Sequence, residues 1–110
     1  MKIILFGANG MLGSYISDYL SSSFEVINMT RNELSLTSSP IEIIDQIEQL
    51  VTSDDVIINA AGIIKQREYN VLELIQVNAI FPHLLSSIKK TIGCEVIHIT
   101  TDCVFKWILY

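Results

Sequence analysis

Three glycines spaced three residues apart offer the first sign of chemistry, in the segment 7–13, Gly-Ala-Asn-Gly-Met-Leu-Gly. The segment directly follows a short apolar run and precedes a helical pattern. In that context such glycines bind the pyrophosphate of a dinucleotide. The first glycine permits a tight turn, the second lets backbone approach the phosphates, and the third lets the helix pack closely. The predicted coenzyme contacts are Gly7, Asn9, Gly10, Met11, Leu12 and Gly13.

The alternative interpretation of this segment is a simple turn with one packing glycine. A kinase-type phosphate loop is excluded, because no Gly-Lys-Ser/Thr sequence follows the glycines. The segment would instead meet phosphate charge with the free N–H groups at the start of the helix.

The end of the second expected strand bears on the choice between the two nicotinamide coenzymes. An acidic residue that binds the ribose hydroxyl is usual there, but the sequence holds Thr30 and Arg31, and no carboxylate is assigned to this place. An arginine can pair with the 2′-phosphate of NADP. We therefore expect NADPH or NADH to bind, with NADPH favoured. A solvated surface arginine is the alternative.

Small residues close the third expected strand, where the sequence reads Asn59-Ala60-Ala61-Gly62. Such side chains barely obstruct a ligand that passes close to backbone, so the four residues are predicted to line the coenzyme site. The alternative is a strand end that packs beneath a helix.

Strand and helix patterns alternate along the chain. Apolar runs predict strands at 2–6, 24–29, 55–59 and 95–100, and helical patterns cover 10–20, 40–51 and 68–90, the last bent near Pro82. Ser39 and Pro40 supply an N-cap and a first-turn proline. The order predicts an α/β fold, a Rossmann-type doubly wound parallel sheet that is truncated to about four or five strands. Ligands of such sheets bind beyond the carboxyl ends of the strands.

Apolar stripes predict which side of each helix is buried. The stripes are Leu12, Tyr15, Ile16 and Tyr19 in the first helix and Ile41, Ile44, Ile47 and Val51 in the second. In the third, Asn78 shares a face with Val71, Leu74 and Leu85, which requires a hydrogen bond for its amide. His98 is expected inside a buried strand, and both His98 and His83 are interpreted as structural.

Composition limits the class of protein. The 110 residues allow one domain at most, and the net charge of −5 argues against a nucleic-acid partner. No segment was expected to reach the roughly 18 apolar residues of a membrane span. Cys94 and Cys103 form no metal-like or redox-like pair, so we expect two reduced cysteines, a cytoplasmic location and no metal site.

Four features together resemble the extended short-chain dehydrogenase/reductase family, specifically its dTDP-4-dehydrorhamnose reductase type. They are the glycine loop, the turn 59–62, Val77-Asn78-Ala79, and the run Ile97-His98-Ile99-Thr100-Thr101-Asp102-Cys103-Val104-Phe105. The resemblance covers about residues 1–105 and implies an NAD(P)H-dependent reduction of a 4-keto nucleotide sugar, in deoxysugar or surface-polysaccharide synthesis. It also implies that the loop and the turn 59–62 hold the coenzyme and that Asn78 lies near the active site.

By the same resemblance, Thr101 corresponds to the catalytic Ser/Thr that hydrogen-bonds the sugar carbonyl. Its family partners are a Tyr that donates the proton and a Lys four residues later that lowers the pKa of that Tyr. No Tyr-x-x-x-Lys occurs in the 110 residues. We therefore expect this chain to bind coenzyme but to be inactive alone.

The last five residues depart from the family, which normally continues after Val104-Phe105 with a short polar residue and glycine. Here the sequence is Lys106-Trp107-Ile108-Leu109-Tyr110. We expect residues 1–105 to be a partial NAD(P)-binding Rossmann domain and 106–110 an atypical tail. One hypothesis is a single-base insertion that shifted the reading frame; a natural short protein or a fragment is the alternative. The exposed sheet edge should make the domain marginally stable and prone to associate.

Other functions remain open at this point. An epimerase or dehydratase shares the same N-terminal fold, and a non-catalytic NAD(P)-binding regulatory module is the rival from another class. A flavodoxin-like signalling domain is disfavoured, because Asn9 stands where such receivers carry carboxylates. A homodimer is left open, and neither a nucleic acid nor a membrane is expected as a partner.

Overall fold

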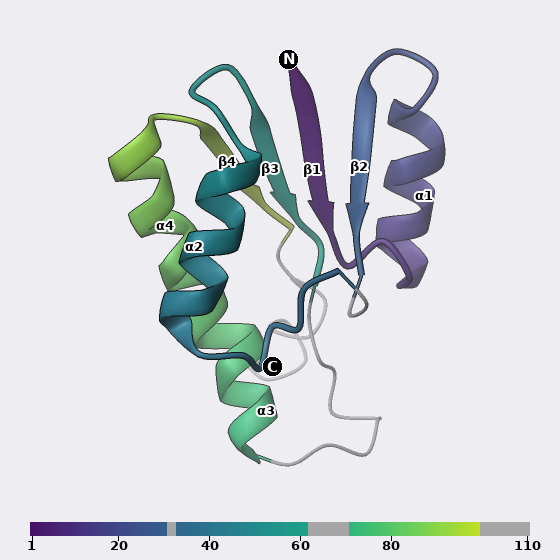
Figure 1. The fold of residues 1–110 in the computed structure, drawn as a ribbon. Helices are drawn as coiled ribbons and strands as arrows, with labels where there is room; N and C mark the ends of the chain where they lie inside the picture. Colours follow the sequence, from purple (N-terminus) through teal and green to yellow (C-terminus); the bar gives the residue numbers. More distant parts are fainter. Residues whose placement is uncertain (31–32, 62–70, 100–110) are drawn as a thin grey trace, which may run out of the picture.

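The computed structural model describes residues 1–30, 33–61 and 71–99. Four strands alternate with helices along the chain, as Figure 1 shows. The elements are β1 (Lys2–Phe6), α1 (Met11–Leu20), β2 (Glu25–Met29), α2 (Pro40–Leu50), β3 (Val56–Asn59), α3 (Val71–Ile75), η1 (Gln76–Ile80), α4 (Phe81–Ile92) and β4 (Glu95–His98). The predicted order of elements is confirmed.

The strands form a parallel sheet in the order β2-β1-β3-β4. From β1 the chain first moves to one side, to β2, and then crosses to the other side, to β3. The order of the strands therefore reverses between β1 and β3. Such a reversal opens a crevice at the carboxyl ends of the strands, where ligands bind in this class of sheet. The predicted fold class is confirmed, with four strands in the described part of the chain.

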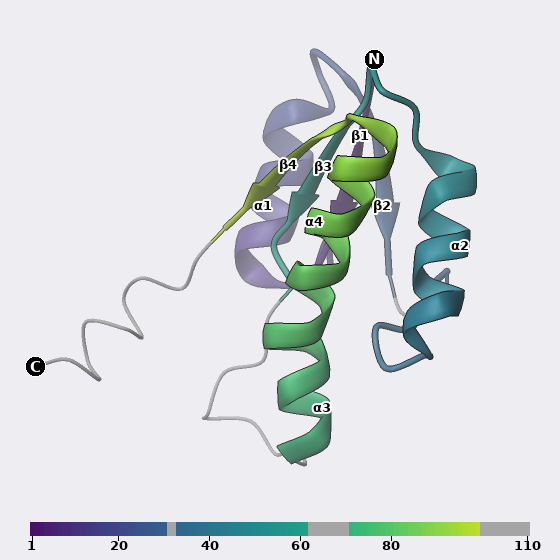
Figure 2. The ribbon, with the colours of Figure 1, turned by 90° about the vertical axis from the view of Figure 1, so that its left-hand side faces the viewer.

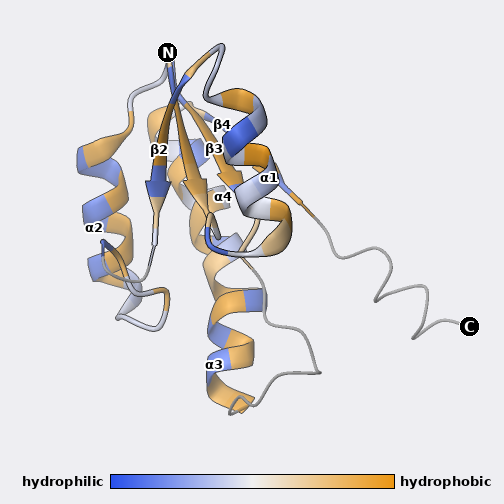
Figure 3. Cartoon of the chain, turned by 90° about the vertical axis from the view of Figure 1, so that its right-hand side faces the viewer, coloured by the Kyte–Doolittle hydropathy of each residue, from blue (hydrophilic) through white to orange (hydrophobic). Residues whose placement is uncertain are grey.

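The sheet lies between two helical layers, with α2 and α4 on one face and α1 on the other (Figures 2 and 3). Side chains of β1 and β3 alternate between the layers. Ile4, Phe6 and Ile57 belong to the cluster beneath α2 and α4, and Ile3, Leu5 and Ile58 to the cluster on the α1 side. Both central strands are thus covered on both faces, which explains why their sequences are continuous apolar runs.

Local signals set the helix ends as expected. The Ser39 hydroxyl accepts a hydrogen bond from the Glu42 N–H at 3.3 Å, and Pro40 begins α2. Gly93 ends α4 with φ of +88°, a left-handed conformation that favours glycine. Lys89 and Lys90 lie in the last turn of α4, where the helix dipole favours positive charge.

The predicted apolar stripes need correction in two helices. In α2 the residues turned inward are Ile43 and Ile47, while Ile41 is 74% exposed, because Ile43, Ile47 and Val51 repeat every four residues. In α1 the small residues Gly13 and Ser17 face the sheet. Tyr15 and Tyr19, on the expected stripe, are 68% and 72% exposed and stack on each other. Ile16, also on the expected stripe, is half-buried and packs against the cluster on this side of the sheet, so only part of the stripe faces inward.

The third helix is continuous from Val71 to Ile92 but contains a π-helical segment, η1. There the Phe81 N–H donates to the Gln76 carbonyl, five residues back instead of four. Pro82 follows at once and has no N–H to donate, which favours an irregular turn just before it. The buried stripe of this helix is Val77, Phe81, Leu84 and Ile88, one position away from the expected stripe, so Val77 is buried and Asn78 is exposed. The prediction that Asn78 lies on the buried apolar face is wrong.

The expectation that no segment could span a bilayer is also wrong by length and composition. Among the described residues, the helix Val71–Ile92 has 22 residues and contains a stretch of 18 with a mean hydropathy of 1.4, which meets that criterion. Its α4 part buries Phe81, Leu84, Leu85 and Ile88 against the rest of the core. Helices in the core of a folded domain often meet the same criterion.

Candidate functional site

The glycine loop meets the end of β3 at the point where strand order reverses. Gly7 has φ of +85°, and a Cβ built on it would lie 2.5 Å from the carbonyl carbon of Ala60 and the nitrogen of Ala61. A Cβ on Gly13 would lie 1.9 Å from the Gly7 carbonyl oxygen. No side chain fits at either place. The predicted roles of the first and third glycines, a tight turn and close helix packing, are supported by these contacts.

Gly10 differs from the other two glycines of the loop. A Cβ on Gly10 would meet a single neighbour within 4 Å, the Gly7 carbonyl oxygen at 3.4 Å. Protein packing therefore does not require glycine at this position. Within the described residues no side chain caps α1, and none of its first-turn residues is acidic. An open Cβ position beside uncapped helix N–H groups fits a phosphate ligand that approaches the backbone.

The rest of the loop lies around this opening. Asn9 and Gly10 are exposed, Met11 is 92% exposed and Leu12 is 49% exposed. Ala60 and Ala61 are half-buried, and the Ala60 N–H donates to the Phe6 carbonyl at 2.9 Å. The structure thus brings the predicted loop and the predicted Ala-Ala turn together at one edge of the sheet.

A carboxylate lies at the end of β2, where none was expected. Glu33 accepts hydrogen bonds from the Thr30 backbone N–H, at 2.9 Å, and from the Thr30 hydroxyl. The hydrogen bonds from Thr30 hold the pKa of Glu33 below its usual range. The expectation that no carboxylate lies at the end of the second strand is therefore wrong. A signal was present in the sequence, since threonine followed three residues later by glutamate is a capping-box pattern.

Asn59 organises the turn that follows β3. Its side chain is almost completely buried, and its Oδ1 accepts the Ala61 N–H at 3.0 Å. Its Nδ2 lies 3.4 Å from His98 Nδ1, and the two residues are register partners in β3 and β4. His98 is exposed, so the expectation of a buried histidine is wrong. In the described part of the chain β4 is the last strand of the sheet and has a neighbour on one side only.

Several predicted site residues lie outside the described residues, namely Arg31, Gly62 and Thr101. Asn78 lies in η1 and is exposed, and it takes part in an interaction within the structure. Cys94 is completely buried among core side chains, as expected for a structural cysteine, and burial raises the pKa of its thiol. Cys103 is outside the described residues.

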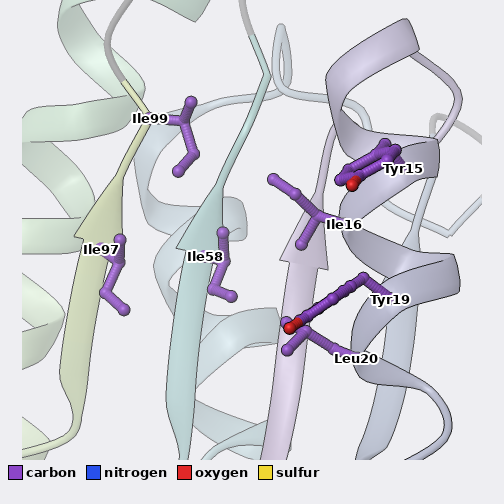
Figure 4. A pocket seen from close by; sticks show the side chains of 7 residues that line it. All are labelled: Tyr15, Ile16, Tyr19, Leu20, Ile58, Ile97 and Ile99. Atoms are coloured by element: carbon purple, nitrogen blue, oxygen red, sulfur yellow. The ribbon is translucent and has the colours of Figure 1, made fainter.

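A shallow apolar groove lies beside α1, on the face of the sheet opposite α2 and α4. Figure 4 shows its lining, which is Tyr15, Ile16, Tyr19, Leu20, Ile58, Ile97 and Ile99. The groove has a volume of about 220 Å³, and none of the side chains that line it is charged. It faces away from the Asn59–His98 pair, because side chains on a strand alternate between the two faces. It is separate from the glycine loop and offers no group for phosphate binding.

Comparison with known proteins places the site in context. Residues 1–106 match the family model described as the RmlD substrate binding domain. The chain is 32% identical over 108 residues to the dTDP-4-dehydrorhamnose reductase of Mycobacterium tuberculosis. The aligned stretch covers 94% of this chain and 34% of that protein. The chain thus spans about a third of the length of the curated relatives it matches.

Solved structures agree in fold. The crystal structure of a hypothetical dTDP-4-dehydrorhamnose reductase from Sulfolobus tokodaii is 31% identical and superposes with a TM-score of 0.78, over 93% of this chain and 40% of that one. The dTDP-4-dehydrorhamnose reductase of Bacillus anthracis, solved in complex with NADP, is 25% identical with a TM-score of 0.68, over 87% of this chain and 35% of that one.

Proposed function

This chain belongs to the family of the RmlD substrate binding domain, and we propose that it forms the coenzyme-binding part of an NAD(P)H-dependent reductase of a 4-keto nucleotide sugar. The proposed substrate class is that of the dTDP-4-dehydrorhamnose reductases it is similar to. The chain covers about a third of these relatives' length, so the activity and substrate of the whole protein belong to the proposal.

One observation carries the proposal: Gly7 lies in close contact with Gly13 on one side and with Ala60 and Ala61 on the other, beside an uncapped helix start. These contacts lie where the order of the strands reverses, which is where dinucleotides bind in such sheets. Gly10 adds an independent argument, since the protein itself leaves its Cβ position open. These features support a site in which the backbone of the glycine loop and the first N–H groups of α1 would bind two phosphates.

Within the proposed reaction the chain's residues bind and orient. The loop Gly7–Gly13 would hold the pyrophosphate, and Ala60 and Ala61 would let the coenzyme pass close to the backbone. The bound coenzyme supplies the hydride. Thr101, which lies outside the described residues, is proposed to donate a hydrogen bond to the sugar carbonyl, as the family resemblance implies.

For the coenzyme we propose NADPH in preference to NADH. Arg31 is next to Thr30 in sequence and can pair with a 2′-phosphate, and the similar Bacillus anthracis reductase was solved with NADP. Glu33 acts in the opposite direction, because a carboxylate at the end of the second strand favours the free ribose hydroxyl of NADH. Arg31 and Glu33 are therefore the two residues that set the preference.

The test is a titration of the chain with each coenzyme, followed by fluorescence or calorimetry, and repeated with Gly10→Val. The Cβ of the new side chain has room, with its nearest neighbour at 3.4 Å, and the side chain occupies the proposed phosphate path. Affinity should therefore fall at least about tenfold while the melting temperature changes little. If the wild-type chain melts cooperatively but binds neither coenzyme at millimolar concentrations, the proposal is wrong.

A second candidate, a coenzyme-binding module without reductase activity, is favoured by one observation: the 110 residues contain no Tyr-x-x-x-Lys. For this chain alone we propose binding without turnover. An assay of NADPH oxidation with a 4-keto nucleotide sugar separates the two functions. Turnover by the purified 110-residue chain would favour the reductase and would show that the missing pair is not needed.

A further inference from the structure

We infer that His98 is a positioning residue for the coenzyme site, and that its protonation loosens the turn after β3 by acting through the Asn59 amide. The inference rests on the proposed function, since it assigns a control to that same site. It starts from the contact between Asn59 Nδ2 and His98 Nδ1, which are 3.4 Å apart.

The orientation of the Asn59 amide is fixed by its other contact. The Ala61 N–H is a donor and lies 3.0 Å from Oδ1, so the oxygen must face Ala61. The nitrogen Nδ2 therefore faces His98 and donates. His98 Nδ1 must accept, which requires a neutral ring with its proton on Nε2.

Protonation of His98 removes this acceptor, because both ring nitrogens of a charged histidine are donors. The Asn59 amide then has two options. It can keep Oδ1 on Ala61 and leave Nδ2 without its acceptor, whether the His98 ring stays or turns away, or it can turn over and lose the Ala61 N–H. Asn59 is only 4% exposed, so water does not easily replace either bond.

The turn affected is the one that meets the glycine loop. Ala60 and Ala61 lie so close to Gly7 that a single methyl group would not fit between them. A change in the Ala61 peptide therefore reaches the wall of the proposed pyrophosphate site directly. His98 itself is exposed and can exchange protons with solvent.

Among the described residues, the elements packed against β4 carry few other groups that titrate. Of the elements packed against β4, β3 carries no ionisable side chain, and α4 carries His83, Lys89 and Lys90. Lys89 pairs with Glu95 at the other end of β4, at 3.2 Å. Asp102 follows four residues after His98 in the sequence, outside the described residues.

The experiment measures the dissociation constant of NADP⁺ from about pH 5.5 to 8, a range in which histidines ordinarily change charge. Three chains are compared: wild type, His98→Gln and His83→Gln. The chain has only two histidines, so His83→Gln is a matched control. The glutamine at 98 keeps an acceptor for Asn59 but cannot titrate. Comparison at each pH removes any titration of the ligand itself.

The expected result is an affinity that falls about two- to tenfold toward low pH in the wild type and in His83→Gln, as for the loss of one hydrogen bond. His98→Gln should stay within about twofold of its high-pH affinity over the whole range. Profiles that coincide for the wild type and His98→Gln would overturn the inference.

A second measurement does not depend on coenzyme binding. In NMR spectra of the free chain the Ala61 amide resonance should move with the same midpoint as the His98 ring, and should stay still in His98→Gln. If no coenzyme binds at any pH, the proposed function fails, and this titration alone decides the coupling. An Ala61 amide resonance that does not move while the His98 ring titrates would overturn the inference.

Discussion

Lys2 and Asp55 join the amino ends of the two central strands, with the Lys2 Nζ 2.6 Å from Asp55 Oδ2. The Lys2 backbone N–H donates to the other carboxylate oxygen at 2.9 Å, and the Thr52 N–H donates to Oδ2 at 2.8 Å. Asp55 is 4% exposed, so this charge is buried but fully paired. The contact lies at the opposite end of the sheet from the glycine loop and holds β1 and β3 in register.

Asp55→Asn should lower the free energy of unfolding at neutral pH by about 3 kcal/mol, since it leaves Lys2 without its partner. Burial alone would raise the pKa of Asp55, but the hydrogen bonds from Lys2 and Thr52 and the charge of Lys2 hold that pKa well below its usual range. The stabilisation is therefore complete above the unfolded pKa of about 3.9 and is lost as the pH falls below it. Urea unfolding at several pH values checks this.

The control is Asp54→Asn, which changes the exposed neighbouring carboxylate. It should leave both the stability at neutral pH and the acid dependence nearly unchanged. Equal effects of the two substitutions would show that net charge, not the Lys2 contact, is responsible.

Gly13→Ala should destabilise the fold as well as coenzyme binding. Its Cβ would lie 1.9 Å from the Gly7 carbonyl oxygen, which is backbone and cannot move aside without shifting α1. We expect a loss of at least about 2 kcal/mol of unfolding free energy. Thermal melting followed by circular dichroism measures it. Gly10→Ala, with a single contact at 3.4 Å, serves as the matched control and should melt close to wild type.

Glu33→Gln should shift the coenzyme preference toward NADPH. The substitution removes the negative charge beside Thr30 at the end of β2, and this charge would repel a 2′-phosphate. The ratio of NADH to NADPH dissociation constants should rise several-fold. Glu25→Gln, at the opposite end of the same strand, should leave that ratio unchanged. A ratio that moves equally in both variants would assign the effect to net charge.

Ile97→Gln should reduce association of the chain with itself. Ile97 is 48% exposed and lines the groove beside the exposed rings of Tyr15 and Tyr19, so the three form an accessible apolar surface. Sedimentation at several concentrations and binding of a hydrophobic dye should both show a decrease. Ile41→Gln replaces an isoleucine that is 74% exposed on α2 and should change neither quantity.

The sequence was sufficient to predict the sheet and the core of the site. Strands β1 and β3 are continuous apolar runs, and the glycines and the Ala60-Ala61 pair follow their ends directly, so each could be located without knowing the strand order. Their contact follows from the pairing of β1 with β3. The alternation of strands and helices predicts that the strands are parallel but does not predict which of them are neighbours.

Three features of the structure were not predicted, and only the first depends on contacts between distant parts of the chain. The Asn59–His98 contact requires β4 to lie next to β3 in a particular register. The Glu33 carboxylate reaches Thr30 through a turn in which the Leu34 N–H donates to the Thr30 carbonyl. The exposure of Asn78 follows from the choice of the stripe Val77, Phe81, Leu84 and Ile88 over its neighbour one residue on, and the packing of α4 against the core decides between the two.

The π-helical segment η1, Gln76–Ile80, contains one residue more than a turn of regular α-helix would. Removal of one residue there would let α3 and α4 continue as a single regular rod while Phe81, Leu84 and Ile88 keep their places in the core. Length variation in proteins is usually sought in loops, whereas here we expect the middle of the helix Val71–Ile92 to tolerate the loss of one residue. An alignment that matches this helix to a regular α-helix would then be shifted by one residue either before or after η1.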